Sequence, residues 1–352
     1  MGVTGHMQGQ GDQSGRVRSA SIWDVARVAG VSQQTVSRVI NGKARVSGAT
    51  RAKVLDAIAE LGYRPNRLAQ ALAGGPVRSV TVLTSDTALY GAAATLRGME
   101  EAARGAGFSV GISVLESGSS MTDVVSRLNR PGEAVMVIAF DEPGLRALHA
   151  LPADVAVTAA VEHHPESAGD RRWQVWLDDR AAAAQATRYL LGLGHRTVHY
   201  LAIPSSTSTI GQRTRGWLDA LEGAGRPAPE PLQGGWSPRS GYLATRGLLE
   251  DRSVTAVLCG NDDLALGVMR AAREAGRDIP GDLSVIGFDD SPASAYLNPS
   301  LTTVRLDFEG LGRACFGLLH RKLEPEAAAP VPVWDEPALI LRESSGPLSR
   351  NA

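Results

Sequence analysis

Between residues 22 and 61, apolar side chains recur every three or four positions in three successive stretches, which is the spacing of helices that bury one face. Gly30 supplies a sharp turn after the first stretch, and Ser32 and Ser47 are placed to cap the second and third helices. We therefore predict three short helices around one small core. The side chains expected in that core are Ile22, Val25, Ala26, Val36, Val39, Ile40, Val54, Leu55, Ile58 and Leu61.

The second predicted helix leaves Gln33, Gln34, Ser37 and Arg38 on its outer face. A short helix, a glycine turn and a helix with a polar outer face are the parts of a helix-turn-helix, whose second helix enters the DNA major groove. Glutamine pairs with adenine there and arginine with guanine. The first 65 residues therefore predict a DNA-binding domain.

Beyond a break at residues 74–76, Gly-Gly-Pro, the pattern changes to buried strands that alternate with helices. Repeated strand–helix–strand units predict parallel sheets covered on both faces. Two such sheets side by side would leave a ligand-binding cleft at the carboxyl ends of their strands. The expected strands are residues 80–83, 108–114, 134–140, 155–161, 198–203, 254–259 and 283–288, and the expected helices are residues 91–104, 180–191, 215–221, 242–249 and 264–275.

The charge of the 352-residue chain is unevenly distributed. Its net charge of −1 combines residues 16–78, with eleven Lys/Arg and three Asp/Glu, and a remainder with 25 basic and 34 acidic residues. A basic N-terminal segment on an otherwise acidic protein indicates a nucleic-acid partner, whose binding would weaken steeply with salt. The hydrophobic content of 43% and charged content of 21% are those of a soluble globular protein.

Cysteine use and hydropathy indicate the compartment. Cys259 and Cys315 are the only cysteines and lie in apolar surroundings, so we expect no disulfide framework. No apolar run approaches the roughly 20 residues that span a bilayer, and the Gly/Gln-rich start lacks the apolar core of a secretory signal. A cytoplasmic protein without membrane association is expected.

The segment D-V-A-x-x-A-G-V-S-x-x-T-V-S-R-V-I-N-G, residues 24–42, followed by P-N-x-x-A-x-x-L, residues 65–72, resembles the lactose-repressor (LacI/GalR) family of transcriptional regulators. The resemblance covers nearly the whole chain and implies an all-α helix-turn-helix headpiece plus an α/β core, similar to periplasmic binding proteins, of two parallel-sheet subdomains. It places Gln33, Gln34 and Arg38 at base-reading positions. Backbone contacts are implied for Trp23, Ser32, Thr35, Ser37, Asn41, Arg45 and Asn66.

The same resemblance implies that residues 66–73 form a hinge helix that folds in the DNA complex. Ala69 is then a DNA contact, and Leu72 is a wedge in a minor-groove base step. The alternative is that Leu72 is a linker residue that touches the core. We expect Leu72→Ala to weaken operator binding with little change in melting temperature, and an unaltered affinity in a gel-shift titration would exclude the wedge.

In the core, the resemblance implies an effector site at the cleft. Arg213 precedes a predicted helix, Asn261 and Asp289 follow predicted strands, and the segment T-S-D-T-A-L-Y-G, residues 84–91, closely matches the lactose-repressor branch. Arginine can fork onto adjacent sugar hydroxyls, and aromatic rings pack against a pyranose. We therefore expect a sugar or glycoside rather than a purine. The effector-binding residues implied are Ser85, Leu89, Tyr90, Glu162, Arg213, Trp236, Asn261, Asp289 and Phe308.

Several of these positions have other interpretations. Asp262 either caps the next helix or contacts the ligand, and Phe308 and Trp236 are alternatively core or surface aromatics. Glu162 fills the role of the family's acidic sugar contact only if the register holds through the charged stretch that follows. The pair His163-His164 is interpreted as part of an exposed loop rather than a metal site.

The resemblance also divides the chain into parts with functions. It gives the DNA-binding domain, 19–65; a hinge helix and linker, 66–78; and an effector-binding and dimerisation domain, 79–352, whose subdomains are 79–177 plus 307–335 and 178–306. Residues 1–18, which precede these parts, are expected to be a disordered tail because of their Gly/Gln-rich composition. The helix at 91–104, with Ala92, Thr95, Leu96 and Met99, is the implied dimer face. A tail without leucine heptads favours a dimer, which requires a pseudo-palindromic operator.

Other function classes remain as alternatives. Adjacent acids at 178–179, 262–263 and 289–290 suggest catalytic carboxylates, but neighbouring side chains on a strand point apart and no G-x-S-x-G, P-loop, H-E-x-x-H or C-x-x-C motif occurs. We expect no enzymatic activity, cofactor or metal. A sugar-binding protein without a regulatory role shares the cleft but not the basic helix-turn-helix. A regulator of the same class with a purine effector is the other alternative.

Overall fold

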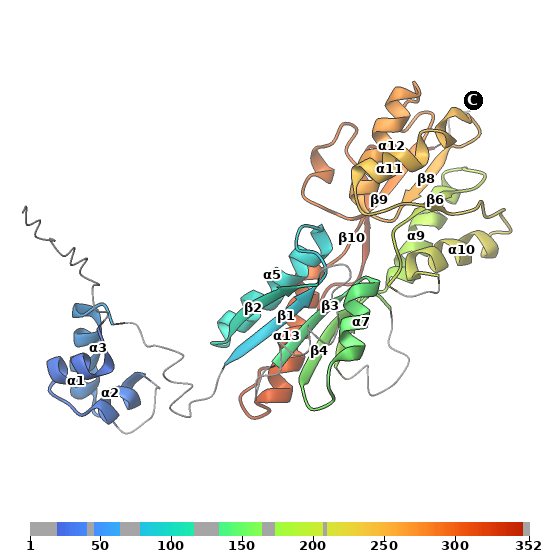
Figure 1. Ribbon diagram of the computed structural model, residues 1–352. Helices are drawn as coiled ribbons and strands as arrows, with labels where there is room; N and C mark the ends of the chain where they lie inside the picture. The colour runs from blue at the N-terminus through green and yellow to red at the C-terminus, as the bar shows by residue number, and fades with distance from the viewer. Residues whose placement is uncertain are drawn as a thin grey trace, which may run out of the picture. The chain divides into compact units, whose positions relative to one another are not determined.

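The computed structural model describes residues 20–40, 46–63, 78–115, 134–163, 173–206 and 210–347. The chain separates into two compact units, Met1–Val77 and Arg78–Ala352 (Figure 1). The first contains α1 (Ile22–Ala29), α2 (Gln33–Ile40) and α3 (Gly48–Glu60), the three helices predicted from the apolar spacing.

The turn and cap residues predicted for the first unit are found in these roles in the structure. Gly30 ends α1 with a left-handed φ of 65°, and the Ser32 hydroxyl accepts the Thr35 N–H at 3.1 Å. Ser47 caps α3 in the same way, accepting the Thr50 N–H. One core prediction was wrong: Leu55 is 52% exposed, because Ala57 occupies the buried side of α3 instead.

The second unit contains two separate sheets. The first has the order β2-β1-β3-β4-β5, and all its strands run parallel. Alternate side chains of each strand face opposite layers: Val82 packs toward α5 and α13, whereas Leu83 packs in the cluster that includes α7. Its elements are β1 (Ser79–Thr84), α5 (Tyr90–Gly105), β2 (Ser109–Val114), β3 (Ala134–Ala139), α7 (Glu142–Ala150), β4 (Ala156–Val161), β5 (Gln174–Trp176) and α13 (Phe308–Leu323).

The second sheet has the order β11-β10-β9-β8-β6-β7 and is parallel except that β11 runs antiparallel to β10. Helices α9 and α10 pack on one face, and α11 and α12 on the other. Its elements are α9 (Asp179–Gly192), β6 (His199–Ala202), α10 (Gln212–Gly223), β7 (Leu232–Gln233), α11 (Pro238–Thr245), β8 (Ala256–Cys259), α12 (Asp262–Glu274), β9 (Ser284–Asp289), β10 (Thr302–Arg305) and β11 (Ala338–Ile340).

The predicted sheets are present, with two differences. Strand β2 lies at a sheet edge and is not buried, since Ile112 and Val114 are each more than half exposed. Strands β5, β7, β10 and β11 were not predicted. They are short, and β10, Thr-Thr-Val-Arg, lacks the apolar run expected of a buried strand.

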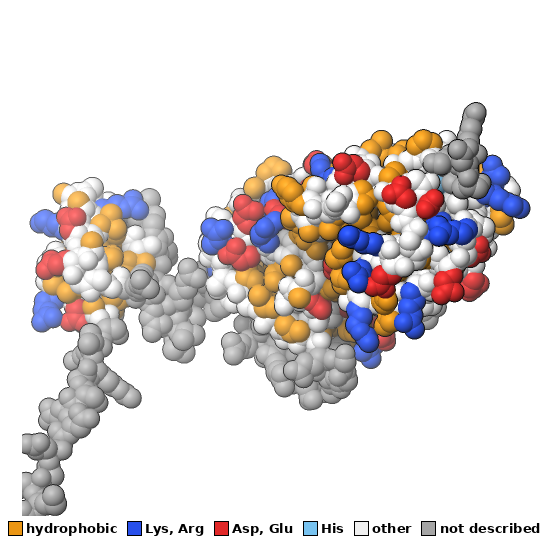
Figure 2. All heavy atoms as spheres, turned by 90° about the horizontal axis from the view of Figure 1, so that it is seen from above, with side chains coloured by type: hydrophobic (Ala, Val, Ile, Leu, Met, Phe, Trp, Pro, Cys, Tyr) orange, Lys and Arg blue, Asp and Glu red, His pale blue; other side chains and the backbone are white. Residues whose placement is uncertain are grey.

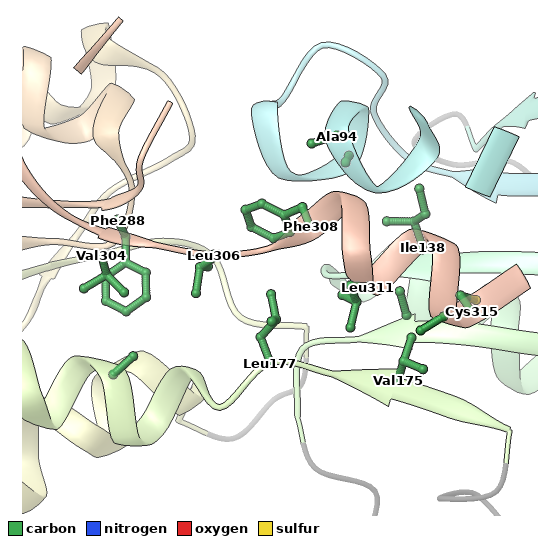
Figure 3. Packing of buried hydrophobic residues seen from close by; sticks show 14 of the residues in the cluster. Ala94, Ile138, Val175, Leu177, Phe288, Val304, Leu306, Phe308, Leu311 and Cys315 are labelled. Atoms are coloured by element: carbon green, nitrogen blue, oxygen red, sulfur yellow. The ribbon is translucent and has the colours of Figure 1, made fainter. Parts of the chain in front are cut away.

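The chain passes between the sheets three times: after β5, after β10, and after α13 on the way to β11. Figure 3 shows that apolar side chains continue along these crossings, with Leu177 and Leu306 between the cores of the two sheets. The crossings therefore join the sheets into one packed body with a cleft between them.

Helices α5 and α13 approach each other closely beside that cleft. A Cβ at Gly98 would clash with the carbonyl oxygen of Glu309, and one at Gly312 would clash with that of Thr95. Glycine is required at both positions for this packing. In the part of the chain that the structure describes, no helix is both long and apolar enough to cross a membrane.

Candidate effector cleft and DNA-binding surface

A cavity lies between the two sheets of the core. Its walls come from the ends of β1, β3, β4, β8 and β9 and from the first turns of α5, α10 and α13. Carboxyl ends of parallel strands thus surround it, as the strand–helix pattern predicted. The nine residues predicted to contact an effector all line this cavity: Ser85, Leu89, Tyr90, Glu162, Arg213, Trp236, Asn261, Asp289 and Phe308.

Arg213 is the central polar group of the cavity. The first turn of α10 holds it, and the side chain is only 10% exposed. Its Nε donates to Asp179 at 2.8 Å, and its Nη1 donates to the Gly260 carbonyl and lies 3.4 Å from Asp289. The guanidinium also stacks 4.3 Å from the centre of the Phe288 ring. Arg213 is therefore fixed in orientation before any ligand arrives.

Burial and the neighbouring carboxylates both affect the pKa of Arg213. Burial disfavours its charged form, but the carboxylates of Asp179 and Asp289 outweigh that penalty and raise the pKa of the guanidinium. Burial in turn raises the pKa of Asp289 well above its ordinary value, although Arg213 opposes this. New hydrogen-bond donors would stabilise the buried carboxylates of Asp179 and Asp289, and the hydroxyl groups of a ligand would supply such donors.

Asp179 is a cavity residue that the sequence analysis missed. Its Oδ2 binds Arg213, but its Oδ1 is buried with no hydrogen-bond partner. An unpaired buried acceptor costs about 1–3 kcal/mol, so this atom is a natural acceptor for a ligand donor. The Asp-Asp pair at 178–179 resembles a helix cap in sequence, and Asp178 does cap α9.

The N-terminus of α12 holds two polar groups at the cavity, Asn261 and Asp262. Asn261 caps α12 by accepting the Leu264 N–H at 2.8 Å, and its amide donates to the Trp236 carbonyl at 3.2 Å. The alternative that Asp262 is the cap was wrong, because Asp262 instead accepts hydrogen bonds from Thr303, Ser291 and Ser294.

The wall from the first sheet combines aromatic and polar side chains. Tyr90 packs edge-on against Phe308 at 6.1 Å between ring centres, and Phe140, not predicted as a site residue, lies 5.9 Å from the same ring. Phe308 is thus both a core residue and a cavity residue. Ser85 donates to Asp141, and Glu162 accepts the Ser206 N–H at 2.8 Å. Glu162 therefore lies at the cavity, as its expected register requires.

The outer face of α2 carries the predicted base-reading side chains. Gln34 and Arg38 are exposed, and Gln33 is half-buried. Trp23, on α1, is 68% exposed, which leaves its indole free to approach a phosphate backbone. Ser32 and Thr35 bond to each other at 2.9 Å across the α2 cap. On the face of the molecule in Figure 2, acidic and basic side chains are interspersed over the core.

Some predictions fall outside the described residues or need correction. Asn41, Arg45, Asn66, Ala69, Leu72 and His164 lie outside them, so the hinge helix stays a prediction from sequence. The predicted dimer face is wrong in part: Ala92, Thr95 and Met99 of α5 are buried in the core of their own chain. Among the described residues, no group of three or more His, Cys, Asp or Glu side chains could hold a metal.

Each of the two units of the chain matches a known protein family. Residues 21–66 match the family described as bacterial regulatory proteins, lacI family, and residues 187–345 match a periplasmic binding protein-like domain. The lactose operon repressor of Escherichia coli K12 is 35% identical over 306 residues, covering 84% of this chain and 83% of that protein. The HTH-type transcriptional repressor PurR of Escherichia coli O139:H28 is 32% identical, covering 92% and 96%.

Solved structures of transcriptional regulators resemble this chain over most of its length. The lac repressor dimer bound to operator and the anti-inducer ONPF superposes with a TM-score of 0.79 at 31% identity, covering 94% of this chain and all of that one. The complex of the transcriptional regulator CelR with cellobiose gives a TM-score of 0.66 at 30% identity, covering 93% and all of that chain. These relatives are repressors and regulators, not enzymes. The chain belongs to the lacI family of bacterial regulatory proteins and is a DNA-binding transcriptional repressor with a ligand-binding core.

Proposed function

We propose that the cavity binds a small sugar or glycoside, and that its occupancy controls the affinity of the headpiece for operator DNA. The observation that carries the proposal is the convergence of Arg213, the unpaired Oδ1 of Asp179 and the Tyr90–Phe308 pair on one cavity. Hydroxyls need bidentate donors and carboxylate acceptors, and the apolar face of a pyranose needs aromatic surface.

A purine effector is the second candidate, because a PurR repressor is among the relatives. The chemistry of the cavity favours the sugar. Among the described residues that line it, carboxylates outnumber cations: Asp141, Glu162, Asp179 and Asp289 face a single arginine. A purine has few donors to offer such acceptors, whereas a saccharide presents one at every hydroxyl. The cellobiose complex of CelR is consistent with this choice.

Calorimetry of the full-length protein separates the candidates. The panel contains D-galactose, D-glucose, lactose and cellobiose beside hypoxanthine and guanine. Binding of a saccharide that is lost in Asp179→Asn, and no binding of either purine, is the expected result. Asp178→Asn is the matched control, since Asp178 caps α9 and does not line the cavity. Purine binding without saccharide binding would contradict the sugar assignment.

For the DNA interface, we propose that Gln33, Gln34 and Arg38 contact base edges, and that Trp23, Ser32, Thr35 and Ser37 contact the backbone. The exposure of Gln34, Arg38 and Trp23 supports this. Such a partner requires a location where operator DNA is accessible, which is the cytoplasm of a bacterium.

We further propose a homodimer on a pseudo-palindromic operator, as in the operator-bound lac repressor dimer. The outward side of α5 and the neighbouring edge strand β2, with exposed Ile112 and Val114, are candidates for the interface. Light scattering at micromolar concentration should give twice the chain mass, and a monomer would refute the proposal. The double variant Ile112→Asp/Val114→Asp should shift the mass toward the monomer.

A further inference from the structure

The end of β9 contains an unusual backbone. Asp289 and Asp290 both have positive φ angles, 109° and 51°, in the region that side chains other than glycine rarely adopt. Such a backbone is strained and persists only where the surrounding structure fixes it. Because Asp289 lines the cavity and faces Arg213, this strained turn decides where one proposed effector contact points.

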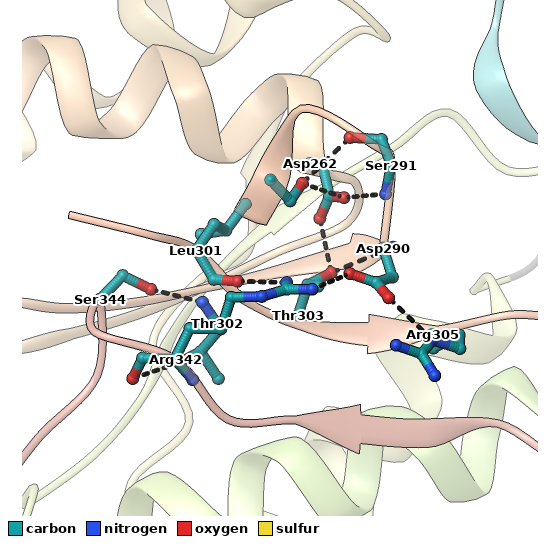
Figure 4. A network of polar contacts seen from close by, with 10 residues as sticks. Asp262, Asp290, Ser291, Leu301, Thr302, Thr303, Arg305, Arg342 and Ser344 are labelled. Atoms are coloured by element: carbon teal, nitrogen blue, oxygen red, sulfur yellow. Dashed lines mark hydrogen bonds and ion pairs between the residues drawn. The ribbon is translucent and has the colours of Figure 1, made fainter. Parts of the chain in front are cut away.

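Contacts of Asp290 hold the turn. Its N–H donates to Thr303 Oγ1 at 3.3 Å, and its carboxylate accepts Arg305 Nε at 2.8 Å and Arg342 Nη2 at 2.6 Å. Figure 4 shows the two guanidinium groups converging on Asp290 from different segments. The Asp290 side chain is only 9% exposed, so water cannot readily replace these partners.

The other side of the turn is held by Asp262. Its carboxylate accepts from Thr303 Oγ1 at 2.6 Å and from the Ser291 N–H at 2.7 Å (Figure 4). The residues directly after Asp289 are therefore bound from α12, from β10 and from the segment that follows β11. On the cavity side, the Asp289 carboxylate lies 3.4 Å from Nη1 of Arg213.

The two arginines at Asp290 differ in burial. Arg305 is 58% exposed, and ion pairs of such exposed side chains contribute little to stability. Arg342 is 16% exposed and also donates Nη1 to the Leu301 carbonyl at 2.8 Å, so its guanidinium is held at both ends. Arg342 is not among the residues that line the cavity.

We propose that Arg342 is a positioning residue for effector binding: by fixing Asp290, it holds the Asp289 carboxylate toward Arg213 and the cavity. The segment after β11 thereby sets effector affinity without touching the ligand. This rests on the proposed function to the extent that Asp289 contacts the effector.

A ligand-free measurement tests the positioning itself. In full-length protein, hydrogen exchange is followed at the amides of Asp290 and Ser291, both of which are bonded in the turn. Arg342→Gln should accelerate exchange there about tenfold, equivalent to about 1.4 kcal/mol of lost protection. Arg305→Gln, which removes the exposed partner of the same carboxylate, should change it less than about twofold. Unchanged protection in Arg342→Gln would overturn the proposal.

A double-mutant cycle tests the consequence for binding, with lactose and cellobiose as calorimetric probes. Arg342→Gln should weaken the affinity about tenfold in the wild-type background and less than about twofold when Asp289→Asn is already present. An equal loss in both backgrounds would mean a general structural effect and refute the proposal. If Arg342→Gln does not fold, Arg342→Lys, which keeps the charge but not the second hydrogen bond, enters the same cycle. Failure of both saccharides to bind the wild type would contradict the proposed function, while the exchange data still decide the positioning.

Discussion

At the residue scale, the cleft is organised around one buried cation and the carboxylates that share it. Arg213 is held by Asp179, by the Gly260 carbonyl and by Asp289 before ligand arrives. A preorganised guanidinium loses little entropy on binding, which favours ligand affinity.

Arg213→Lys tests this arrangement. Lysine retains the charge but not the planar fork, so saccharide affinity should fall at least about tenfold. Operator affinity without ligand should change little, since Arg213 lies in the core unit. Arg215→Lys is the control, because Arg215 lies two residues further along α10 and its side chain is exposed. Calorimetry and operator titration measure the two quantities, and unchanged saccharide affinity in Arg213→Lys would refute the role.

Arg38→Ala tests the DNA interface. A bidentate contact with guanine contributes about 1–3 kcal/mol of discrimination against the wrong base. The variant should therefore lose preference at one operator position while its salt dependence changes little. Arg27→Ala removes a similarly exposed arginine from α1 and should leave base preference intact. Binding to a randomised operator library reads out both, and an unaltered preference in Arg38→Ala would exclude base contact.

The sequence predicted individual residues unequally. Motifs with fixed spacing identified the nine cavity residues, because family resemblance carries position as well as type. Asp179 was missed because the Asp-Asp pair at 178–179 was considered only as possible catalytic carboxylates, and the sequence does not show that Asp178 caps α9 while Asp179 binds Arg213. The contact of Arg342 with Asp290 joins residues 52 positions apart, and no local pattern encodes it.

At the element scale, the close packing of α5 on α13 fixes one wall of the cleft, because Tyr90 begins α5 and Phe308 begins α13. Gly98→Ala would place a methyl group against the Glu309 backbone and should destabilise the core by about 1–3 kcal/mol. Gly105→Ala, at the end of the same helix with open space around it, should be neutral or slightly stabilising. Thermal melts compare the two, and equal stabilities would contradict the packing.

Elements were predictable where periodicity was long and were missed where it was short. The apolar runs of β3 and β8 identify buried strands, whereas β10 and β11 are four and three residues long and take their structure from their neighbours. Strand β2 was predicted to be buried because it contains apolar residues. Its sequence does not show that it lies at the edge of the sheet, where its side chains are exposed.

At the scale of the whole molecule, control of operator binding by a ligand in the cleft requires that the core unit influence the DNA-binding unit. A ligand can change operator affinity only by binding the two states of the core unequally. We expect a ligand to meet this condition by contacting both sheets at once, because residues of both line the cavity.

The central claim is therefore tested most directly by one titration. Fluorescence anisotropy follows a labelled duplex, selected by the protein from a random pool, with and without a saccharide that calorimetry shows to bind. We predict a change in duplex affinity of about 5- to 150-fold for the wild type, and a clearly smaller change in Arg213→Lys at the same saccharide concentration. Identical duplex affinity with the cleft of the wild type empty and saturated would contradict the account.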